Sequence, residues 1–299
     1  MNGLFAKLSD SDFVEYVTSF DVCVLSETFT LPSFDFSIYF NDFIILHSPA
    51  VKLSRMGRNS GGLVILIRKR LSEFVKSIDT KHENILCSRL SKQLFGCEKD
   101  VLFVGLYNHP VGSAFYENKE YSCSLDLLEQ FLLSQMESGE DPYFLIGGDF
   151  NSRIGDWSFD VLDDVDDDDD DYVYTFERRS QDTVINNFGK NLIQLCYMFD
   201  LVPLNGLVCK EFDERFTFYS ERGNSTIDYF VSSVDFVTYV CSLSVAQRVE
   251  SQHMPVLLGA HAIPSHDNQS DFMTHSSDKM KWDSSKAQLY LDYLLSENS

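Results

Sequence analysis

Short apolar runs bounded by turn-forming residues constrain the fold of this 299-residue chain more than any other feature. Each run is long enough for a strand, and several follow one another with no helical segment between them. That order favours stacked sheets with helices outside them over a simple alternating βαβ array. The predicted strands are Val22–Leu25, Leu63–Ile67, Ile85–Leu90, Val101–Leu106, Tyr143–Ile146 and Asp228–Val231.

Three segments carry the apolar spacing of helices instead. Ser124 is expected to cap a helix that reaches Met136, with Gly139 just beyond its end. A stripe of apolar residues predicts a second helix over Asn187–Phe199. A shorter helix is expected over Asp12–Thr18, leading into the first strand. The fold class is therefore α/β.

The predicted elements lie within residues 1–260, which are expected to form one compact domain. Residues 261–299 have the composition of a polar linker, followed by an amphipathic terminal helix over Trp282–Leu295. The 7 cysteines include no Cys-x-x-Cys pair, which argues against a zinc site or a disulfide scaffold. No membrane-length apolar run and no secretory signal are visible, so we expect a nuclear or cytoplasmic protein without a membrane partner.

Charge limits the partners of the chain. The formal net charge is −22, and the run Asp163–Asp171 contributes much of it because eight of its nine residues are Asp. Such a surface repels nucleic acid, so a phosphate substrate would need a local basic patch or bound divalent cations. Arg178, Arg179, Arg215 and Arg222 are the candidates for that patch. The Asp run itself is expected to be a solvated loop between strands.

The strongest local signal is Tyr-Phe-Leu-Ile-Gly-Gly-Asp-Phe-Asn at residues 143–151. The strand ends in two glycines, which let the backbone approach a ligand, and strand alternation then puts Asp149 and Asn151 on the same side. This pair suits an attacking water, because Asp accepts its proton while Asn orients it. A strand followed by an Asx-type turn would explain the same residues equally well.

Two further patterns add acid and imidazole groups. Glu27 follows the strand Val22–Leu25, at the kind of strand end where α/β proteins collect catalytic groups, and its oxygens suit Mg²⁺. Asp228 begins a predicted strand, and His253 lies in Ser-Gln-His-Met-Pro. An acid can orient an imidazole and stabilise its cation beside a phosphate. Taken singly, Glu27 or His253 is more typical of a surface or core residue.

The combination is more specific than any part. Six candidate residues occur in a fixed order along the chain: Glu27, Tyr107, Asp149, Asn151, Asp228 and His253. With this set the chain resembles the endonuclease/exonuclease/phosphatase family and, within it, the apurinic-endonuclease-like domain of non-LTR retrotransposons. Further motifs that agree are Ser26–Thr28, Arg58–Gly62, Arg179–Asp182 and Leu204–Gly206. The resemblance covers Asn2 to about Ala260, and the tail from Lys281 is similar to a connector that leads to a reverse transcriptase, which this chain lacks.

The resemblance implies a four-layer α/β sandwich, in which two packed mixed β-sheets are flanked by helices. It also implies Mg²⁺-dependent (or Mn²⁺-dependent) hydrolysis that nicks one strand of DNA. Glu27 would bind the metal, and Asn2 matches a metal-adjacent position. Physically, the metal would supply a Lewis acid, while fixed donors meet the charge that grows on the phosphoryl group.

The resemblance also implies a role for each remaining residue. Asp149 would activate water and Asn151 would position it. Tyr107 and His253 would stabilise the charge on the pentacovalent phosphorus, and Asp228 would hold His253. Thr217 and Arg179 would lie at the substrate phosphate.

Two departures from the family pattern bear on activity. The family opens with a short strand that ends in a catalytic Asn two positions before the match to Asn2, and here Met1 stands between, so that strand is expected to be missing. The acid that usually precedes the motif His is Gln252, which takes one negative charge from the metal site. We therefore expect weak or absent nicking by this chain.

Two other functions stay open. A phosphatase or phosphodiesterase acting on lipid or inositol phosphates would share this site, although the Ser-Glu-Thr motif favours the DNA enzyme. A non-catalytic remnant that binds DNA or protein is favoured by the acidity of the chain and by its short start.

Overall fold

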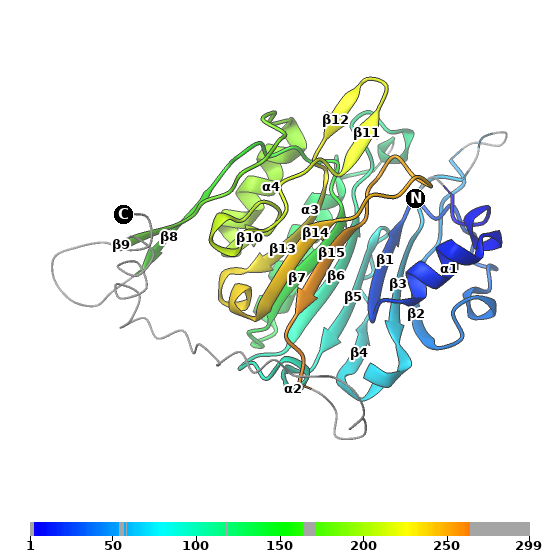
Figure 1. The fold of residues 1–299 in the computed structure, drawn as a ribbon, viewed down its shortest axis with the longest axis horizontal. Helices are drawn as coiled ribbons and strands as arrows, with labels where there is room; N and C mark the ends of the chain where they lie inside the picture. The colour runs from blue at the N-terminus through cyan, green and yellow to red at the C-terminus, as the bar shows by residue number, and fades with distance from the viewer. Residues whose placement is uncertain (1–2, 54–56, 58, 118, 164–171, 264–299) are drawn as a thin grey trace. The chain divides into compact units, whose positions relative to one another are not determined.

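A computed structural model describes residues 3–53, 57, 59–117, 119–163 and 172–263 (Figure 1). The strands are β1 (Val22–Ser26), β2 (Phe43–Ser48), β3 (Leu63–Arg68), β4 (Val75–Ile78), β5 (Ile85–Leu90), β6 (Val101–Tyr107), β7 (Tyr143–Asp149), β8 (Phe159–Asp163), β9 (Tyr172–Phe176), β10 (Leu201–Pro203), β11 (Phe218–Ser220), β12 (Gly223–Ser225), β13 (Asp228–Ser233), β14 (Val240–Val245) and β15 (Val256–Ala260). The α-helices are α1 (Ser11–Thr18), α2 (Lys92–Phe95), α3 (Ser124–Glu137) and α4 (Asn187–Met198). Short 3₁₀ helices are η1 (Lys7–Ser9), η2 (Phe36–Ile38), η3 (Lys69–Phe74), η4 (Ala114–Tyr116), η5 (Val208–Lys210) and η6 (Val234–Tyr239).

All six predicted strands are confirmed, as β1, β3, β5, β6, β7 and β13, and the three predicted helices are α1, α3 and α4. The start of α3 differs by one residue from the expectation. Cys123 is its N-cap and Ser124 its first residue, because the carboxylate of Asp126 reaches back to the backbone N–H of Cys123 in a capping box.

The central sheet has six strands in the order β10-β13-β7-β6-β5-β4. The sheet is mixed, since β6 and β7 are parallel while every other pair of adjacent strands in it is antiparallel. Every residue of β6 is buried. Strand alternation sends Val101 and Phe103 to one core, and Leu102 and Val104 to the core on the opposite face. An apolar run without a polar face thus belongs to a strand covered on both sides.

A second layer of strands packs on one face of this sheet. It consists of the antiparallel sheet β1-β3-β2 and the hairpin β14-β15. Ile65 and Ile67 of β3 share a core with Phe103 and Leu145 of the six-stranded sheet. Helices α3 and α4 bury their apolar stripes on the opposite face of the six-stranded sheet, and α1 covers the outer face of the smaller sheet (Figure 1). The expected four-layer α/β sandwich is confirmed, although among the described strands only the six-stranded sheet has mixed pairing.

Some expectations fall on residues outside the described part of the chain. Asn2, residues 164–171 of the Asp run and the predicted helix over residues 282–295 are among them. The strands that flank the Asp run, β8 and β9, form an antiparallel hairpin. Residues 1–263 make up one compact unit. Within the described residues, no helix combines the length and apolar character that crossing a bilayer requires.

Candidate functional site

Sheet register aligns three of the expected site residues. Tyr107, at the end of β6, lies opposite Asp149, at the end of the parallel strand β7. Asp149 in turn lies opposite Asp228, the first residue of the antiparallel strand β13. Because all three occupy one row across adjacent strands, their side chains emerge at one edge of the six-stranded sheet.

Glu27 reaches this row from the other sheet. It follows β1, and its Oε1 accepts a hydrogen bond of 2.7 Å from the hydroxyl of Tyr107. Tyr107 is 2% exposed, and burial together with the charge of Glu27 raises the pKa of its hydroxyl far above the usual range. Tyr107 therefore stays protonated and remains a hydrogen-bond donor. The contact joins residues 80 positions apart and brings the two sheets together at the site.

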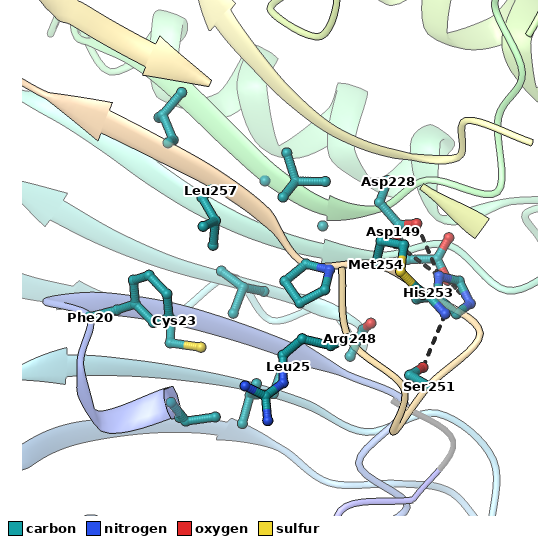
Figure 2. A pocket seen from close by; sticks show the side chains of 18 of the residues that line it. Phe20, Cys23, Leu25, Asp149, Asp228, Arg248, Ser251, His253, Met254 and Leu257 are labelled. Carbon is teal, nitrogen blue, oxygen red and sulfur yellow. Dashed lines mark hydrogen bonds and ion pairs between the residues drawn. The ribbon is translucent and has the colours of Figure 1, made fainter. Parts of the chain in front are cut away.

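His253 completes the cluster from the loop that precedes β15. Its Nδ1 lies 3.0 Å from each carboxylate oxygen of Asp228, and its Nε2 lies 3.9 Å from Oδ2 of Asp149 (Figure 2). Burial lowers the pKa of His253, but Asp228, through its charge and hydrogen bond, raises it more, and Asp149 adds to the rise. The resulting pKa of about 9 makes His253 a cation at neutral pH, with Asp228 as its orienting partner.

Asp149 is almost completely buried, with 2% of its surface exposed. Burial and the negative charge of Asp228 raise the pKa of Asp149 well above the usual range, against the opposing effect of His253. The preceding Gly148 has φ of +150°, and a Cβ there would lie 2.0 Å from the carbonyl oxygen of Leu106. A larger residue would thus push β7 away from β6 at the position that sets the direction of Asp149.

Asn151 takes part in the Asx-type turn that was the alternative interpretation of this motif. Its backbone N–H donates to Oδ1 of Asp149 at 3.0 Å, which is the Asx-type bond. Its φ is +48°, and its side-chain Nδ2 donates to the carbonyl oxygen of Asn108 at 2.7 Å. The turn therefore holds the carboxamide beside the carboxylate. Sequence reasoning missed Asn108, which is fully buried and links this turn to α3 through the N–H of Ser124.

Two residues that were expected to contact the substrate, Thr217 and Arg179, form hydrogen bonds within the protein. Thr217 is 0% exposed, and its hydroxyl accepts hydrogen bonds of 3.0 Å from the N–H groups of Ile227 and Asp228. It thereby holds the start of β13, beside the cluster, and its role at the substrate phosphate stays a prediction. Arg179 is exposed, and its backbone N–H donates to the carbonyl of Gly206. Among the described residues, this hydrogen bond lies outside the cluster of Asp149, Asp228 and His253.

The expected basic patch is also smaller than the sequence suggested. Arg178 is 3% exposed and donates to the carbonyl oxygens of Asn205 and Trp157, so it braces the interior. Arg215 binds the carboxylate of Asp213 in its own loop. Arg179 and Arg222 are exposed, and the side chain of Arg215 is 41% exposed although it is paired with Asp213. The sequence does not distinguish a buried arginine from an exposed one, because tertiary packing decides which polar atoms surround the guanidinium.

His109 is a buried neighbour of the site that sequence reasoning also missed. Its ring lies edge-on to Tyr107 at 4.5 Å and stacks on Phe115 at 3.9 Å. Its Nε2 has no hydrogen-bond partner among the described residues. Burial lowers the pKa of His109 to about 4, so its imidazole is neutral and packs against the back of Tyr107.

The donor set of the site fits a hard divalent cation. Asp149, Asp228 and His253 each offer one ligand atom, and these atoms lie within 4.8 Å of one another. However, Nδ1 of His253 is already bonded to Asp228, and Mg²⁺ prefers oxygen ligands. Glu27 adds a further negative charge that acts on Asp149. A cation near the Glu27 and Asp149 carboxylates would offset this concentration of negative charge, whereas His253 suits an anionic substrate better.

Comparison with known proteins agrees with this fold. The sequence pattern of the endonuclease/exonuclease/phosphatase family matches residues 2–253, and the chain belongs to that family. No protein of curated function matches it.

Three similar solved structures show the same fold. The AP endonuclease LMAP from Leishmania major is 14% identical, with a TM-score of 0.61 and coverage of 88% of this chain and 85% of that one. The 3′ phosphatase NExo from Neisseria, bound to product DNA hairpin, is 15% identical, with a TM-score of 0.55 and coverage of 87% and 96%. The endonuclease domain of TRAS1, a telomere-specific non-LTR retrotransposon, is 13% identical, with a TM-score of 0.52 and coverage of 87% and 93%.

Proposed function

We propose that this chain is a divalent-metal-dependent DNA endonuclease of the retrotransposon type. The observation that carries the proposal is the convergence of Glu27, Tyr107, Asp149, Asp228 and His253, from both sheets, on one sheet edge. Two of the similar structures, an AP endonuclease and a retrotransposon endonuclease domain, support DNA as the substrate.

The residues have two separate tasks: one accepts the proton of the attacking water, and others donate hydrogen bonds to the phosphate. Asp149, whose pKa is raised by burial, accepts the proton of an attacking water, since a general base works best with a pKa near the working pH. Asn151 positions that water. The imidazolium of His253, held by Asp228, donates to the phosphoryl oxygens as negative charge grows there. The single O–H of Tyr107, which donates to Glu27 in this structure, would turn to the same oxygens.

Glu27 would hold Mg²⁺ or Mn²⁺, with Asn2 as a further candidate ligand outside the described residues. When bound, the metal polarises the phosphate as a Lewis acid. Gln252 leaves this site with one carboxylate fewer than the family pattern, so we expect slow turnover.

A supercoiled-plasmid nicking assay in Mg²⁺, in Mn²⁺ and in EDTA tests the proposal. Asp149→Asn should lower the metal-dependent nicking rate by about 100-fold, because it removes the general base. Asp141→Asn is the matched control, since Asp141 is 81% exposed and, among the described residues, its ion pair is with Lys99. Nicking that is equal in wild type and Asp149→Asn, or that persists in EDTA, would contradict the proposal.

A phosphomonoesterase is the second candidate. The similar fold of a 3′ phosphatase favours it, and so does the mixed chemistry of the family. Release of inorganic phosphate from 3′-phosphorylated DNA and from an inositol phosphate, under the same metal conditions, separates this candidate from the endonuclease.

A further inference from the structure

The backbone that carries Glu27 is strained. Glu27 has φ of +52°, and Phe29, two residues later, has φ of +56°. Both values lie in the left-handed region, which residues other than glycine rarely adopt. Such conformations persist where the surrounding structure holds them, and they concentrate at functional sites. The contacts of this segment therefore decide where the carboxylate of Glu27 lies.

Backbone hydrogen bonds hold one side of the segment. The N–H groups of Thr28 and Phe29 donate to the carbonyl oxygens of Gly62 and Gly61 at 3.1 and 3.0 Å. A Cβ at Gly62 would lie 2.5 Å from Oγ1 of Thr28, so only glycine leaves room for this hydroxyl. Thr28 is 1% exposed, and a buried hydroxyl needs a hydrogen-bond partner of its own.

Three side chains supply that partner in sequence, and we call them the Thr-His bridge: Thr28, Thr30 and His47. Oγ1 of Thr28 lies 2.9 Å from Oγ1 of Thr30, which lies 3.1 Å from Nε2 of His47. Thr30 is 4% exposed. His47 belongs to β2, which is separated from β1 by β3 in the smaller sheet (Figure 1). The Thr-His bridge thus ties the segment after β1 to the far strand of its sheet.

One arrangement of protons satisfies both hydroxyls of the Thr-His bridge. Burial lowers the pKa of His47, so its imidazole is neutral at pH 7 and has one accepting nitrogen. If Nε2 accepts, Thr30 donates to His47 and Thr28 donates to Thr30. If Nε2 donates instead, Thr30 donates to Thr28, whose own proton then has no acceptor among the hydrogen bonds of the described residues. Because an unmatched buried donor is costly, Nε2 is the acceptor.

Packing fixes the histidine end of the Thr-His bridge. His47 lies opposite Val64 of β3, which lies opposite Leu25 of β1. The three side chains therefore share one face of the sheet, where Leu25 and Val64 belong to a buried core. The ring of Phe36 meets that of His47 edge-on, with 4.8 Å between the ring centroids. These contacts hold the imidazole in one place, as a fixed acceptor requires.

We propose that His47 is a positioning residue for the metal-binding carboxylate of Glu27. Through the hydroxyls of Thr30 and Thr28, His47 holds the strained segment in the conformation that brings Glu27 beside Tyr107. This role rests on the proposed binding of a divalent cation by Glu27, and it does not require that the chain nicks DNA.

Binding of Mn²⁺ to the full chain tests this role without DNA, with the free ion measured by electron paramagnetic resonance. The Asp residues of the run 163–171 also attract Mn²⁺, so only the binding that Glu27→Gln removes is counted. His47→Leu should weaken that binding about fivefold, as the loss of one hydrogen bond would. His47→Gln offers a carbonyl acceptor and should restore the wild-type affinity.

A double-mutant cycle shows whether His47 acts through the Thr-His bridge. Thr30→Val removes the middle hydroxyl at nearly constant size and should also weaken binding about fivefold. The double variant should stay near fivefold, whereas independent effects would multiply to about 25-fold. His82→Leu is the matched control, because His82 is also partly buried and only its backbone takes part in the hydrogen bonds of the described residues. It should bind Mn²⁺ as the wild type does, and circular dichroism shows whether each variant is folded.

Nitrogen-15 NMR of the histidine side chains tests the proton arrangement. At pH 7.5 we expect Nδ1 of His47 to carry the proton and Nε2 to carry none, with the signal assigned by its loss in His47→Gln. A proton on Nε2, equal Mn²⁺ affinity in wild type and His47→Leu, or multiplied effects in the double variant would overturn the role of His47. A wild type without Glu27-dependent Mn²⁺ binding would overturn the metal site together with it. Weakened Mn²⁺ binding in His47→Leu by a chain that nicks no DNA would support the role of His47 and contradict only the endonuclease.

Discussion

Replacing Asp228 by Asn should move the pKa of His253 across neutrality. The two oxygens of Asp228 both lie 3.0 Å from Nδ1 of His253, so the carboxamide of Asn keeps the size and one acceptor but loses the charge. Burial lowers the pKa of His253, and in the variant the charge of Asp228 no longer outweighs this effect. Only Asp149, whose Oδ2 is 3.9 Å from Nε2, still favours the cation.

The size of the pKa change follows from comparing His253 with and without the charge of Asp228. In the wild type the pKa of His253 is about 9, and without its partner we expect about 7 or less. A drop of at least about 2 pH units corresponds to about 2.7 kcal/mol between the two protonation states. At pH 7.5 the protonated share of His253 would fall from nearly all molecules to about a quarter or less.

NMR titration of histidine side chains between pH 5 and pH 10 measures this pKa directly. Loss of one signal in His253→Gln assigns the resonance, and Asp235→Asn, at an exposed acid outside the cluster, controls for the loss of one negative charge. A pKa near 9 for His253 in Asp228→Asn, or near 6.5 in the wild type, would refute the reasoning. If the chain nicks DNA, the alkaline limit of its pH profile should move with this pKa.

The remaining predictions concern stability. Burial holds the pKa of His109 near 4, below the unfolded value of 6.5, so the unfolded chain binds a proton first and His109 costs stability as pH falls from 6.5 to 4, by about 3 kcal/mol. Urea unfolding at pH 7.5 and pH 4.5 should show less acid destabilisation in His109→Phe than in the wild type; equal losses would contradict this. Arg153→Met leaves the buried Asp182 without its bidentate partner and should cost about 3–5 kcal/mol in the same assay. Arg70→Met breaks an exposed pair with Asp21 and should cost about 0–1 kcal/mol, and equal costs for both would contradict the argument.

The core strands and the chain order of the site could be predicted from the sequence. Runs such as Val101–Leu106 are apolar on both faces, and burial on both faces is the physical condition that such a run satisfies. Shorter or more polar strands, such as β11 and β12, lack this signal because they are only partly buried. The carboxylates of Asp149 and Glu27 were found because each stands at the end of an apolar run, where side chains leave the sheet edge. In the structure Asp149 is the last residue of β7, and Glu27 directly follows β1.

Other site features depend on contacts between distant segments. Nothing local distinguishes a Thr217 that accepts two buried N–H groups from one that faces a phosphate, or a buried Arg178 from the exposed Arg179. The environment of each polar atom comes from strands far away in the chain, and its desolvation is decided only when those strands pack.

The sequence by itself determined which segments are buried and which acids follow them, since local spacing and side-chain polarity suffice for both. Tertiary structure decided the pairings of Tyr107 with Glu27 and of Asp228 with His253. The reason is that a strand specifies what it can bury but not which neighbour supplies the hydrogen bonds on each edge. That choice is made by the whole set of strands as they pack.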